Sequence, residues 1–382
     1  MRILHVYRTY FPDTQGGLEE VIRQICSGTS RYGAECRVLT TSKNGPTVVD
    51  FEGVLVTRMP ELFEVASCNV SARAISAFRE LANWADVIHF HFPWPFADLM
   101  NEVVSHGKPT VVTYHSDIVR QKVLRWLYAP LMRRFLSSAD RIVCTSPNYF
   151  ATSNALTAFE SKVEVIPIGL NSDSYPSVDD SVVETVANEY GRDFFLFVGV
   201  LRYYKGLHIL LDAIQGAPFN VVIVGSGPTE SSLKFQAERL GLTNVYFTGY
   251  VENEIKGALF KLSKAIVFPS YLRSEAFGVT LLEGAMNSKP LVSTEVGSGT
   301  SHVNVHGKTG FVVAPGSAKS LRRAMNYLHE HPEEARLMGT RAKNRFEKLF
   351  TGDLMAGRYW HLYCDLTNVD PVARDPQGTP AT

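Results

Sequence analysis

The chain has 382 residues, which is longer than a single compact core usually supports, so at least two domains are expected. Hydrophobic residues make up 45% and charged residues 20%, close to the average of soluble globular proteins, which argues against a disordered chain. Lys and Arg number 38 and Asp and Glu also number 38, so the chain lacks the basic excess of a nucleic-acid-binding protein, and no nucleic-acid partner is predicted.

The cysteines and the opening segment indicate a cytoplasmic protein. The five cysteines are scattered and form no C-x-x-C pair, so neither a zinc ribbon nor a disulfide framework is predicted. The opening apolar run, Ile3–Tyr7, is too short for the core of a secretory signal, and no apolar run of about 18 residues occurs. We therefore expect a protein of the reducing cytoplasm without a membrane-spanning segment.

In the first half of the chain, short apolar runs alternate with helical patterns. This alternation predicts right-handed βαβ units on a largely parallel sheet, an α/β fold. The expected strands are 2–7, 36–41, 54–59, 86–92, 109–115, 141–146 and 163–168. The expected helices are 18–32, 71–84, 95–106, 116–138 and 147–159.

The second half repeats the scheme and predicts a second doubly wound domain. Ligands of such sheets bind outside the carboxyl ends of the strands, so a cleft lined by the loops that follow the strands is expected. The expected strands are 194–200, 220–225, 245–250, 265–270 and 290–294. The expected helices are 206–215, 229–240, 252–262 and 278–287.

Polar segments suggest the domain boundaries. Residues 173–192, rich in Ser, Asp and Asn, are interpreted as a linker between an N-terminal domain, 1–172, and a C-terminal domain, 193–350. Residues 368–382 contain three prolines and no periodic pattern, so we expect a disordered tail there.

The most informative motif is E-A-F-G-V-T-L-L-E, which follows the expected strand 265–270. It places Glu275 at the mouth of a loop and Glu283 two turns into a helix. Because Gly278 has no side chain, the amides of Phe277, Gly278 and Val279 could receive a phosphate at the helix start. An amphipathic helix with two surface glutamates is an equally weighted alternative.

Three glycine-containing loops are further candidates. In G-V-L-R-Y-Y-K-G, Arg202 and Lys205 follow a strand, where two cations can hold a diphosphate, although most such loops are merely solvated. Gly16 and Gly17 permit positive φ and close approach of an anion or sugar, although such pairs usually form only a turn. G-S-G-P (225–228) is a nucleotide-loop candidate, but G-x-G-x-x-G is incomplete there, so dinucleotide binding is not predicted.

Three histidines lie on two expected strands. His115 ends the strand V-V-T-Y-H-S-D, whereas His89 and His91 alternate onto one face of the strand 86–92. A metal site built from them is the weaker interpretation, because the second half supplies no further ligands. We favour His115 as a polar contact in the cleft and the other two as structural, with no metal ion.

The segment 116–138 predicts a basic amphipathic helix, interrupted or restarted at Pro130. With the exposed Trp126, it could rest on an anionic membrane or contact a lipid diphosphate. A core-packed helix with a solvated basic face is equally weighted. The basic residues are Arg120, Lys122, Arg125, Arg133 and Arg134. The apolar residues repeating every four positions are Val119, Val123, Leu127, Leu131 and Phe135.

A series of motifs follows along the chain in this order: G-G-L-E-E, the histidine at a strand end, the K-G loop, G-S-G-P, E-x7-E and T-G-F-V-V-A-P (309–315). With these motifs in this order, the chain resembles the retaining nucleotide-sugar glycosyltransferases of family 4 over nearly its whole length. The family has the GT-B architecture, with two Rossmann-like domains facing a central cleft. Y-H-S-D-I-V and G-T-S-H-V-N (299–304) are most similar to bacterial enzymes that add α-mannose or D-rhamnose from GDP-sugars to O-antigen or exopolysaccharide intermediates.

The resemblance implies roles for individual residues. Glu275 would contact the transferred sugar, Glu283 the ribose hydroxyls and Lys205 the diphosphate. His115 matches the histidine that contacts the donor sugar. The position of the family's arginine is occupied by Val200, and Arg202 is the candidate substitute. In this family the C-terminal segment often returns to the first domain, which predicts that 351–367 packs there.

The implied reaction is front-face displacement with retention, without a cofactor or metal. No D-x-D motif occurs where a metal is expected, so Arg202, Lys205 and the helix start at 277–279 would meet the charge on the departing diphosphate. The implied partners are a nucleotide-sugar donor, with a GDP-sugar favoured, and a glycan or polyprenol-diphosphate-linked acceptor. Peripheral contact at the inner face of the cytoplasmic membrane is part of this hypothesis. The alternatives are a nucleotide-sugar epimerase or hydrolase of the same architecture and a non-catalytic sensing subunit.

Overall fold

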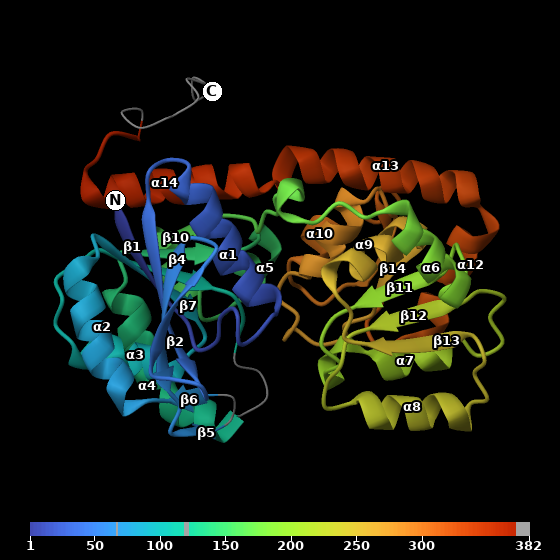
Figure 1. Cartoon of the computed structure of the whole chain (residues 1–382). Helices are drawn as coiled ribbons and strands as arrows, with labels where there is room; N and C mark the ends of the chain where they lie inside the picture. The colour runs from blue at the N-terminus through green and yellow to red at the C-terminus, as the bar shows by residue number, and fades with distance from the viewer. Residues whose placement is uncertain (66–67, 118–121, 372–382) are drawn as a thin grey trace. The chain divides into compact units, whose positions relative to one another are not determined.

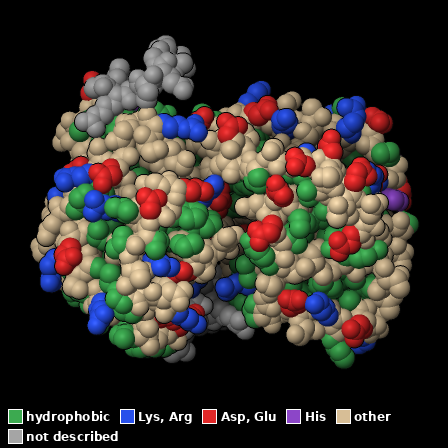
Figure 2. Space-filling view, viewed as in Figure 1, with side chains coloured by type: hydrophobic (Ala, Val, Ile, Leu, Met, Phe, Trp, Pro, Cys, Tyr) green, Lys and Arg blue, Asp and Glu red, His purple; other side chains and the backbone are tan. Residues whose placement is uncertain are grey.

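The computed structural model describes residues 1–65, 68–117 and 122–371, the side chains of 122–125 excepted (Figure 1). The chain forms two compact units. Unit 1 is Met1–Ile168 together with the segment from Gly352 onward, and unit 2 is Gly169–Thr351. Across the described residues, every helix is too short or too polar to cross a bilayer. Acidic and basic side chains are interspersed on the face seen in Figure 2, as equal numbers of the two suggest.

Unit 1 is built on an eight-stranded sheet in the order β10-β9-β8-β7-β1-β2-β4-β3, in which all neighbouring strands are parallel except β3 and β4. The parallel plan is the one that the sequence predicts, whereas β3 and the small antiparallel hairpin β5–β6 were not expected. The strands are β1 (Arg2–Val6), β2 (Glu35–Ser42), β3 (Thr47–Phe51), β4 (Val54–Pro60), β5 (Phe63–Val65), β6 (Cys68–Val70), β7 (Val87–Phe92), β8 (Thr110–Tyr114), β9 (Arg141–Cys144) and β10 (Val163–Val165). The α-helices are α1 (Gly17–Ser30), α2 (Ala72–Trp84), α3 (Pro95–Val103), α4 (Lys122–Ser138), α5 (Pro147–Thr152) and α14 (Gly352–Thr367).

The central strand β7, V-I-H-F-H-F, is buried along its whole length, as a strand of a parallel sheet covered on both faces must be. Its two faces differ in chemistry. Phe90 packs edge-to-face or tilted against Phe78 of α2 and Phe135 of α4, with ring centroids 5.7 and 5.2 Å away. On the opposite face, His89 and His91 lie stacked with centroids 4.3 Å apart. The alternation read from the sequence therefore separates an apolar face from a polar one.

The C-terminal helix α14 belongs to unit 1, where it packs against α1 and β7 (Figure 1). Gly28 of α1 permits this close approach, because a Cβ at that position would lie 2.4 Å from Cβ of Ala356. Tyr32 and Trp360 stack with centroids 5.8 Å apart. A helix separated from the rest of its unit by more than a hundred residues thus completes the cover of the sheet.

Unit 2 is built on a six-stranded, wholly parallel sheet in the order β13-β12-β11-β14-β15-β16. The strands are β11 (Phe195–Val198), β12 (Val221–Val224), β13 (Val245–Gly249), β14 (Ala265–Phe268), β15 (Leu291–Thr294) and β16 (Gly310–Val313). The α-helices are α6 (Asp180–Tyr190), α7 (Leu207–Ala213), α8 (Glu230–Arg239), α9 (Asn253–Leu262), α10 (Val279–Met286), α11 (Thr300–Val303), α12 (Ala318–Glu330) and α13 (Pro332–Leu349).

The order of the strands in unit 2 reverses between β11 and β14, so the chain continues outward from this pair in both directions. Such a reversal leaves a crevice at the carboxyl ends of the two strands, where ligands of doubly wound sheets bind. The loops that follow these strands, 199–206 and 269–278, carry the K-G motif and the first glutamate of E-x7-E.

The segment 173–192 differs from the linker interpretation. It contains α6, which belongs to unit 2 and packs against α9. Asp179, Asp180 and Ser181 lie where this helix starts, a position that favours Asp and Ser for the same reasons that loops do. The change of unit falls instead between Ile168 and Gly169.

Candidate active site

In unit 2, the loops after β11 and β14 bring a cation and a carboxylate together. Lys205 Nζ lies 2.5 Å from Oε2 of Glu275, and Ser270 Oγ donates a hydrogen bond to the same oxygen over 3.2 Å. The side chains of the pair are 13% and 9% exposed. The Lys205 ammonium also lies 4.5 Å from the ring centroid of Phe268. The Lys205 ammonium is thus held in place at the topological switch point, where it can bind an anionic ligand.

Gly206 explains why the K-G loop can lie there. Its φ of +71° is in the left-handed region, and a Cβ would lie 2.1 Å from the carbonyl oxygen of Pro269. Only glycine therefore allows the loop after β11 to approach the end of β14 so closely.

The G-S-G-P loop has a similar packing role. A Cβ on Gly225 would lie 2.2 Å from the carbonyl oxygen of Gly199, and one on Gly227 would lie 2.6 Å from that of Leu201. These glycines let two neighbouring loops lie against each other. That packing accounts for the motif without a ligand.

The two glutamates of E-x7-E are not surface residues, so the alternative of an ordinary amphipathic helix is wrong. Glu275 is 7% and Glu283 is 6% exposed. Lys256 Nζ on α9 lies 3.0 Å from Oε1 of Glu283. Each buried carboxylate thus has a lysine partner, as buried charges require.

The helix that follows starts one or two residues later than the sequence suggests. Gly278, with a φ of +88°, is the N-cap residue, and α10 begins at Val279. The side chain of Phe277 is an anchor in the interior of unit 2, because Gly299 leaves room for it: a Cβ on that glycine would lie 2.4 Å from Cδ2 of the ring. The unbonded amides of the first turn therefore begin at Val279 rather than at Phe277.

Arg202 stands apart from the pair of Lys205 and Glu275. It is exposed and caps the short 3-10 turn Tyr203–Lys205. Its guanidinium forms no hydrogen bond or ion pair with any residue that the structure describes. Val200, at the position of the family's arginine, is 41% exposed.

In unit 1, His115 follows β8 and is joined to a row of buried rings. Its amide donates to the carbonyl oxygen of Phe92 over 3.0 Å. Its Nε2 lies 3.0 Å from Nδ1 of His91, whose Nε2 lies 3.0 Å from Nδ1 of His5. The neighbouring His89 belongs to a different set of hydrogen bonds, with Tyr363 and Thr113 at 2.7 Å each.

Burial keeps His89, His91 and His115 neutral. It lowers the pKa of His115 to about 3, and the pKa values of His89 and His91 lie well below the ordinary value. His115 is 3% exposed and His91 1%. At neutral pH these rings therefore act through hydrogen bonds rather than through charge.

Two groups within unit 1 have donor atoms close enough together to surround a metal ion. They are His5 with Cys26 and Cys36, and His5 with His89 and His91, with ligand atoms no more than 4.8 Å apart within each group. Both share His5, which the sequence analysis did not single out. That no metal ion takes part stays a prediction.

The Gly16-Gly17 pair differs from its interpretation as a positive-φ loop. Gly16 is extended, with a φ of −156°, and caps α1. A Cβ on it would lie 2.6 Å from Oε2 of Glu19, a carboxylate that accepts from Thr14 Oγ1 over 3.0 Å. The start of α1 therefore already has a negative charge beside it, which favours a sugar hydroxyl over an anion as a ligand.

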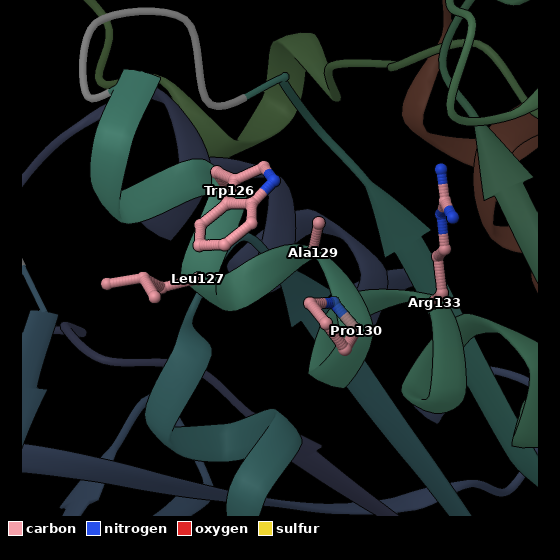
Figure 3. A pocket seen from close by; sticks show the side chains of 5 residues that line it. All are labelled: Trp126, Leu127, Ala129, Pro130 and Arg133. Carbon is pink, nitrogen blue, oxygen red and sulfur yellow. The ribbon is translucent and has the colours of Figure 1, made fainter.

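Along α4, two exposed apolar side chains near the middle of the helix contrast with two buried ones near its end. Trp126 is 77% and Leu127 is 63% exposed, and they line a surface hollow of about 410 Å³ with Ala129, Pro130 and Arg133 (Figure 3). Phe135 and Leu136 are fully buried. The apolar residues spaced by four thus do not form one buried stripe.

The structure corrects the expectations for Pro130 and for the basic charge of α4, and some of the basic residues lie outside what it describes. Pro130 lies inside one helix and does not start a second. Arg134 is ion-paired with Glu102, so part of the predicted basic charge is neutralised. Arg120 lies outside the described residues, and so do the side chains of Lys122 and Arg125.

Sequence reasoning missed the partners of the predicted residues. Lys256, Ser270 and His5 are polar residues in or beside apolar segments, which is the one signal that could have drawn attention to them. Tyr359 and Tyr363 lie in α14, where Tyr359 Oη is 2.8 Å from Thr113 Oγ1. Their role depends on a helix returning from far along the chain, which no local pattern specifies.

Two doubly wound, largely parallel sheets in one chain give the GT-B fold. The chain belongs to glycosyltransferase family 4. The family model described as Glycosyltransferase Family 4 matches residues 15–174, and the model described as Glycosyl transferases group 1 matches residues 184–345. Together they span most of both units, so the chain is an enzyme that transfers a sugar.

Two curated relatives are similar over almost their whole length. The D-rhamnosyltransferase WbpZ of Pseudomonas aeruginosa is 53% identical over 92% of this chain and 92% of its own. The O-antigen chain mannosyltransferase C of Escherichia coli is 46% identical over 96% of this chain and 99% of its own.

Solved structures share the fold at low identity. A sucrose-phosphate synthase from Thermosynechococcus elongatus superposes with a TM-score of 0.80 at 19% identity, covering 96% of this chain and 99% of that one. Anabaena HepE in complex with UDP-glucose superposes with a TM-score of 0.78 at 19% identity, covering 96% and 100%. At these identities the likeness establishes the GT-B fold alone.

Proposed function

We propose that this enzyme transfers a hexose, an α-mannosyl or D-rhamnosyl residue, from a GDP-sugar to a glycan or polyprenol-diphosphate-linked acceptor in bacterial O-antigen synthesis. The relatives named for D-rhamnosyl transfer and for O-antigen mannosyl transfer, at 53% and 46% identity, support the sugar and the pathway. The observation that carries the proposal is the buried pair of Lys205 and Glu275 at the switch point of unit 2.

In the proposed donor site, Lys205 binds the diphosphate and Glu275 binds hydroxyls of the transferred sugar. The ammonium is already at the switch point, and the carboxylate beside it holds it in place. The exposed Arg202 can add a second positive charge once a diphosphate is bound, because none of the residues that the structure describes holds its guanidinium. The amides that open α10, with Gly278 ahead of them, supply further donors.

Glu283 is proposed to bind the ribose hydroxyls. A carboxylate is an acceptor only, and a pair of vicinal hydroxyls supplies two donors to it. Lys256, 3.0 Å from Oε1, holds the carboxylate before the nucleotide arrives. In unit 1, His115 is proposed to contact the donor sugar, with Gly16 and Gly17 offering backbone groups to a sugar hydroxyl.

The proposed chemistry is displacement with retention at the anomeric carbon, with the leaving diphosphate taking the acceptor's proton. Lys205, Arg202 and the start of α10 would stabilise the charge that develops on that diphosphate without a bridging metal. Analysis of the anomeric configuration of the product tests this step, and an inverted product contradicts it. Full activity in EDTA is expected, and a strict requirement for a divalent cation contradicts the metal-independent site.

Calorimetric titration of GDP, UDP and ADP with EDTA present is the experiment that tests the donor. We expect GDP to bind most tightly. A preference for UDP would keep the glycosyltransferase and discard the GDP-sugar.

A product assay with the GDP-sugar, with and without acceptor, separates the alternatives. Transfer only with acceptor supports the proposal, whereas turnover without acceptor indicates a hydrolase or epimerase. Nucleotide binding without any turnover indicates a sensing subunit.

The first half of α4 is proposed to contact an anionic membrane surface near the lipid-linked acceptor. Trp126 and Leu127 are exposed apolar side chains that line the same hollow as the basic Arg133, a combination that suits the interface of an anionic bilayer (Figure 3). Cosedimentation with vesicles containing phosphatidylglycerol should fall in the variant W126S. The substitution F235S, which removes another exposed aromatic side chain, on α8, should leave vesicle binding unchanged. Equal binding by all three proteins would contradict the contact.

A further inference from the structure

Three imidazoles in hydrogen-bond contact join the interior of unit 1 to His115. His5, His91 and His115 are 0%, 1% and 3% exposed, and the two contacts between their ring nitrogens are both 3.0 Å long. In each contact, one nitrogen must carry a proton and the other must not. Since a neutral imidazole carries one proton, the protons must all point the same way along the row.

The end of the row at His5 decides which way they point. Its Nε2 is buried and has no hydrogen-bond partner among the residues that the structure describes. If the protons pointed toward His5, this nitrogen would be a buried N–H without an acceptor, which is rarer and costlier than a bare acceptor. If they point toward His115, Nε2 of His5 is unprotonated and faces the sulfurs of Cys26 and Cys36, which lie within 4.8 Å.

The two cysteines do not reverse this order. Burial raises the pKa of the Cys26 thiol, whereas a hydrogen bond from Cys26 lowers that of Cys36. His5 and the Thr29 hydroxyl also lower the pKa of the Cys36 thiol. Nε2 of His5 nevertheless has no hydrogen-bond partner among the described residues, so the hydrogen bond from His5 that would hold a Cys36 thiolate is not formed. Both side chains are also at most 7% exposed, where an unpaired thiolate is costly.

We propose that His5 and His91 are positioning residues that hold His115 as its Nδ1–H tautomer. Nε2 of His115 accepts from His91, so Nδ1 carries the proton and is left as a donor. Nδ1 has no protein partner among the described residues. His115 therefore presents a neutral N–H to a ligand oxygen and cannot act as a base there. That this oxygen belongs to the donor sugar rests on the proposed function, whereas the tautomer does not.

His89 offers a matched control. It lies on the same face of the same strand and stacks on His91, with centroids 4.3 Å apart. Its two ring nitrogens bond to Tyr363 and Thr113 rather than to the row. A phenylalanine at position 89 thus changes the same layer without breaking the connection to His115.

The tautomer is tested by NMR of the full chain labelled with ¹⁵N in its histidine rings. The resonances of His115 are assigned as those missing from H115F. We expect protonated Nδ1 and unprotonated Nε2 at His115 in the wild type, H89F and C36A. The fixed tautomer should be lost in H91F and kept in H91N, whose side-chain amide N–H can replace the donor. A protonated Nε2 in the wild type overturns the proposal, and so does an equal loss in H91F and H89F.

Steady-state transfer assays give the second readout. H91F should lower kcat by about 3- to 10-fold, the effect of one neutral hydrogen bond, with H91N restoring it. GDP affinity should not change in either variant, because its proposed contacts are in unit 2. If H91F does not fold, the NMR spectrum of H91N decides. Full activity of H115F would overturn the role of His115 under the proposed function while leaving the tautomer measurement to stand by itself.

Discussion

Unit 1 and unit 2 follow the same doubly wound plan but put their polar groups in different places. In unit 1, the rings of His5, His89 and His91 lie on adjacent central strands and are at most 1% exposed. In unit 2, the central strands β11, β12 and β14 carry only apolar side chains. The charged pairs lie outside the strands: Lys205 and Glu275 on the loops after β11 and β14, and Lys256 and Glu283 on α9 and α10.

The difference shows two ways of keeping a polar group in a folded core. The imidazoles of unit 1 remain in the sheet because they are hydrogen-bonded, His5 and His91 to each other and His89 to Tyr363 and Thr113. The lysines and glutamates of unit 2 form ion pairs at the edge of the sheet, where an anionic ligand can join them. We therefore expect acid to lower the stability of unit 1, and substitutions that remove a single charge to impair the activity or ligand binding of unit 2.

Acid gives the largest expected contrast. Unfolded histidine takes up a proton below about pH 6.5, whereas burial keeps folded His89 and His91 unprotonated to much lower pH and His115 to about pH 3. The stability that they contribute is complete above pH 6.5 and is lost as the pH falls. The free energy of unfolding falls by about 1.4 kcal/mol per pH unit for each histidine, and so by as much as about 4 kcal/mol per pH unit for all three.

The four tryptophans make this loss measurable, because Trp84, Trp94, Trp126 and Trp360 all belong to unit 1. Urea unfolding followed by tryptophan fluorescence should weaken steeply between pH 6.5 and 5.5. The part of the circular dichroism signal that remains after the tryptophans are exposed should shift less. Equal shifts of both signals would contradict the contrast between the units.

Removing the charge at the switch point should produce the next largest effect. K205A leaves the Glu275 carboxylate buried without its lysine and takes away a fixed cation, so we expect kcat to fall by about 10²–10³-fold. Transfer at saturating GDP-sugar is the measurement. K234A, which breaks an exposed pair with Glu230 on α8, should leave kcat unchanged. A loss below tenfold in K205A would mean that the diphosphate charge is met elsewhere.

Glu283 should affect binding more than turnover. E283A removes the proposed acceptor for the ribose hydroxyls, and hydrogen bonds to a charged group contribute about 1.5–3 kcal/mol, so GDP should bind about 10- to 100-fold more weakly. Calorimetry gives the affinity, with E230A as the matched control on the exposed pair. Unchanged affinity for GDP together with a lower kcat would move Glu283 from the nucleotide to the reacting sugar.

Two glycines with nearly the same backbone conformation give the finest comparison. Gly206 and Gly216 have φ values of +71° and +67°, but only a Cβ at Gly206 would collide with Pro269, whereas the space around Gly216 is open. We expect G216A to lose about 1 kcal/mol of stability from backbone strain and G206A about 2–3 kcal/mol. Urea unfolding followed by circular dichroism measures both. Equal losses would mean that the loop moves away from β14 without cost.

The sequence predicts the elements of this fold better than their meeting points. The apolar runs of β7 and β14 specify buried strands, and the alternation in β7 places His89 and His91 on one face. The contact of Lys205 with Glu275 depends instead on β11 lying beside β14, which is a matter of strand order. His5 joins His91 for the same reason, because β1 lies beside β7. Short edge strands such as β3 were missed because they have no buried run to mark them.

The placement of α14 has a consequence for how the protein is made. Unit 2 is one uninterrupted stretch of 183 residues, Gly169–Thr351. Unit 1, in contrast, needs the helix α14, which is synthesised only after the whole of unit 2. At about 5–20 residues per second, the first segment of unit 1 waits about 10–40 s for that helix. During that time the groove over β7 and α1 lacks its cover, and His89 and Thr113 lack the tyrosines that bond to them. Unit 2 can therefore complete its folding first although it is translated second. Until then, the incomplete first segment of unit 1 is the part of the chain that we expect a chaperone to bind.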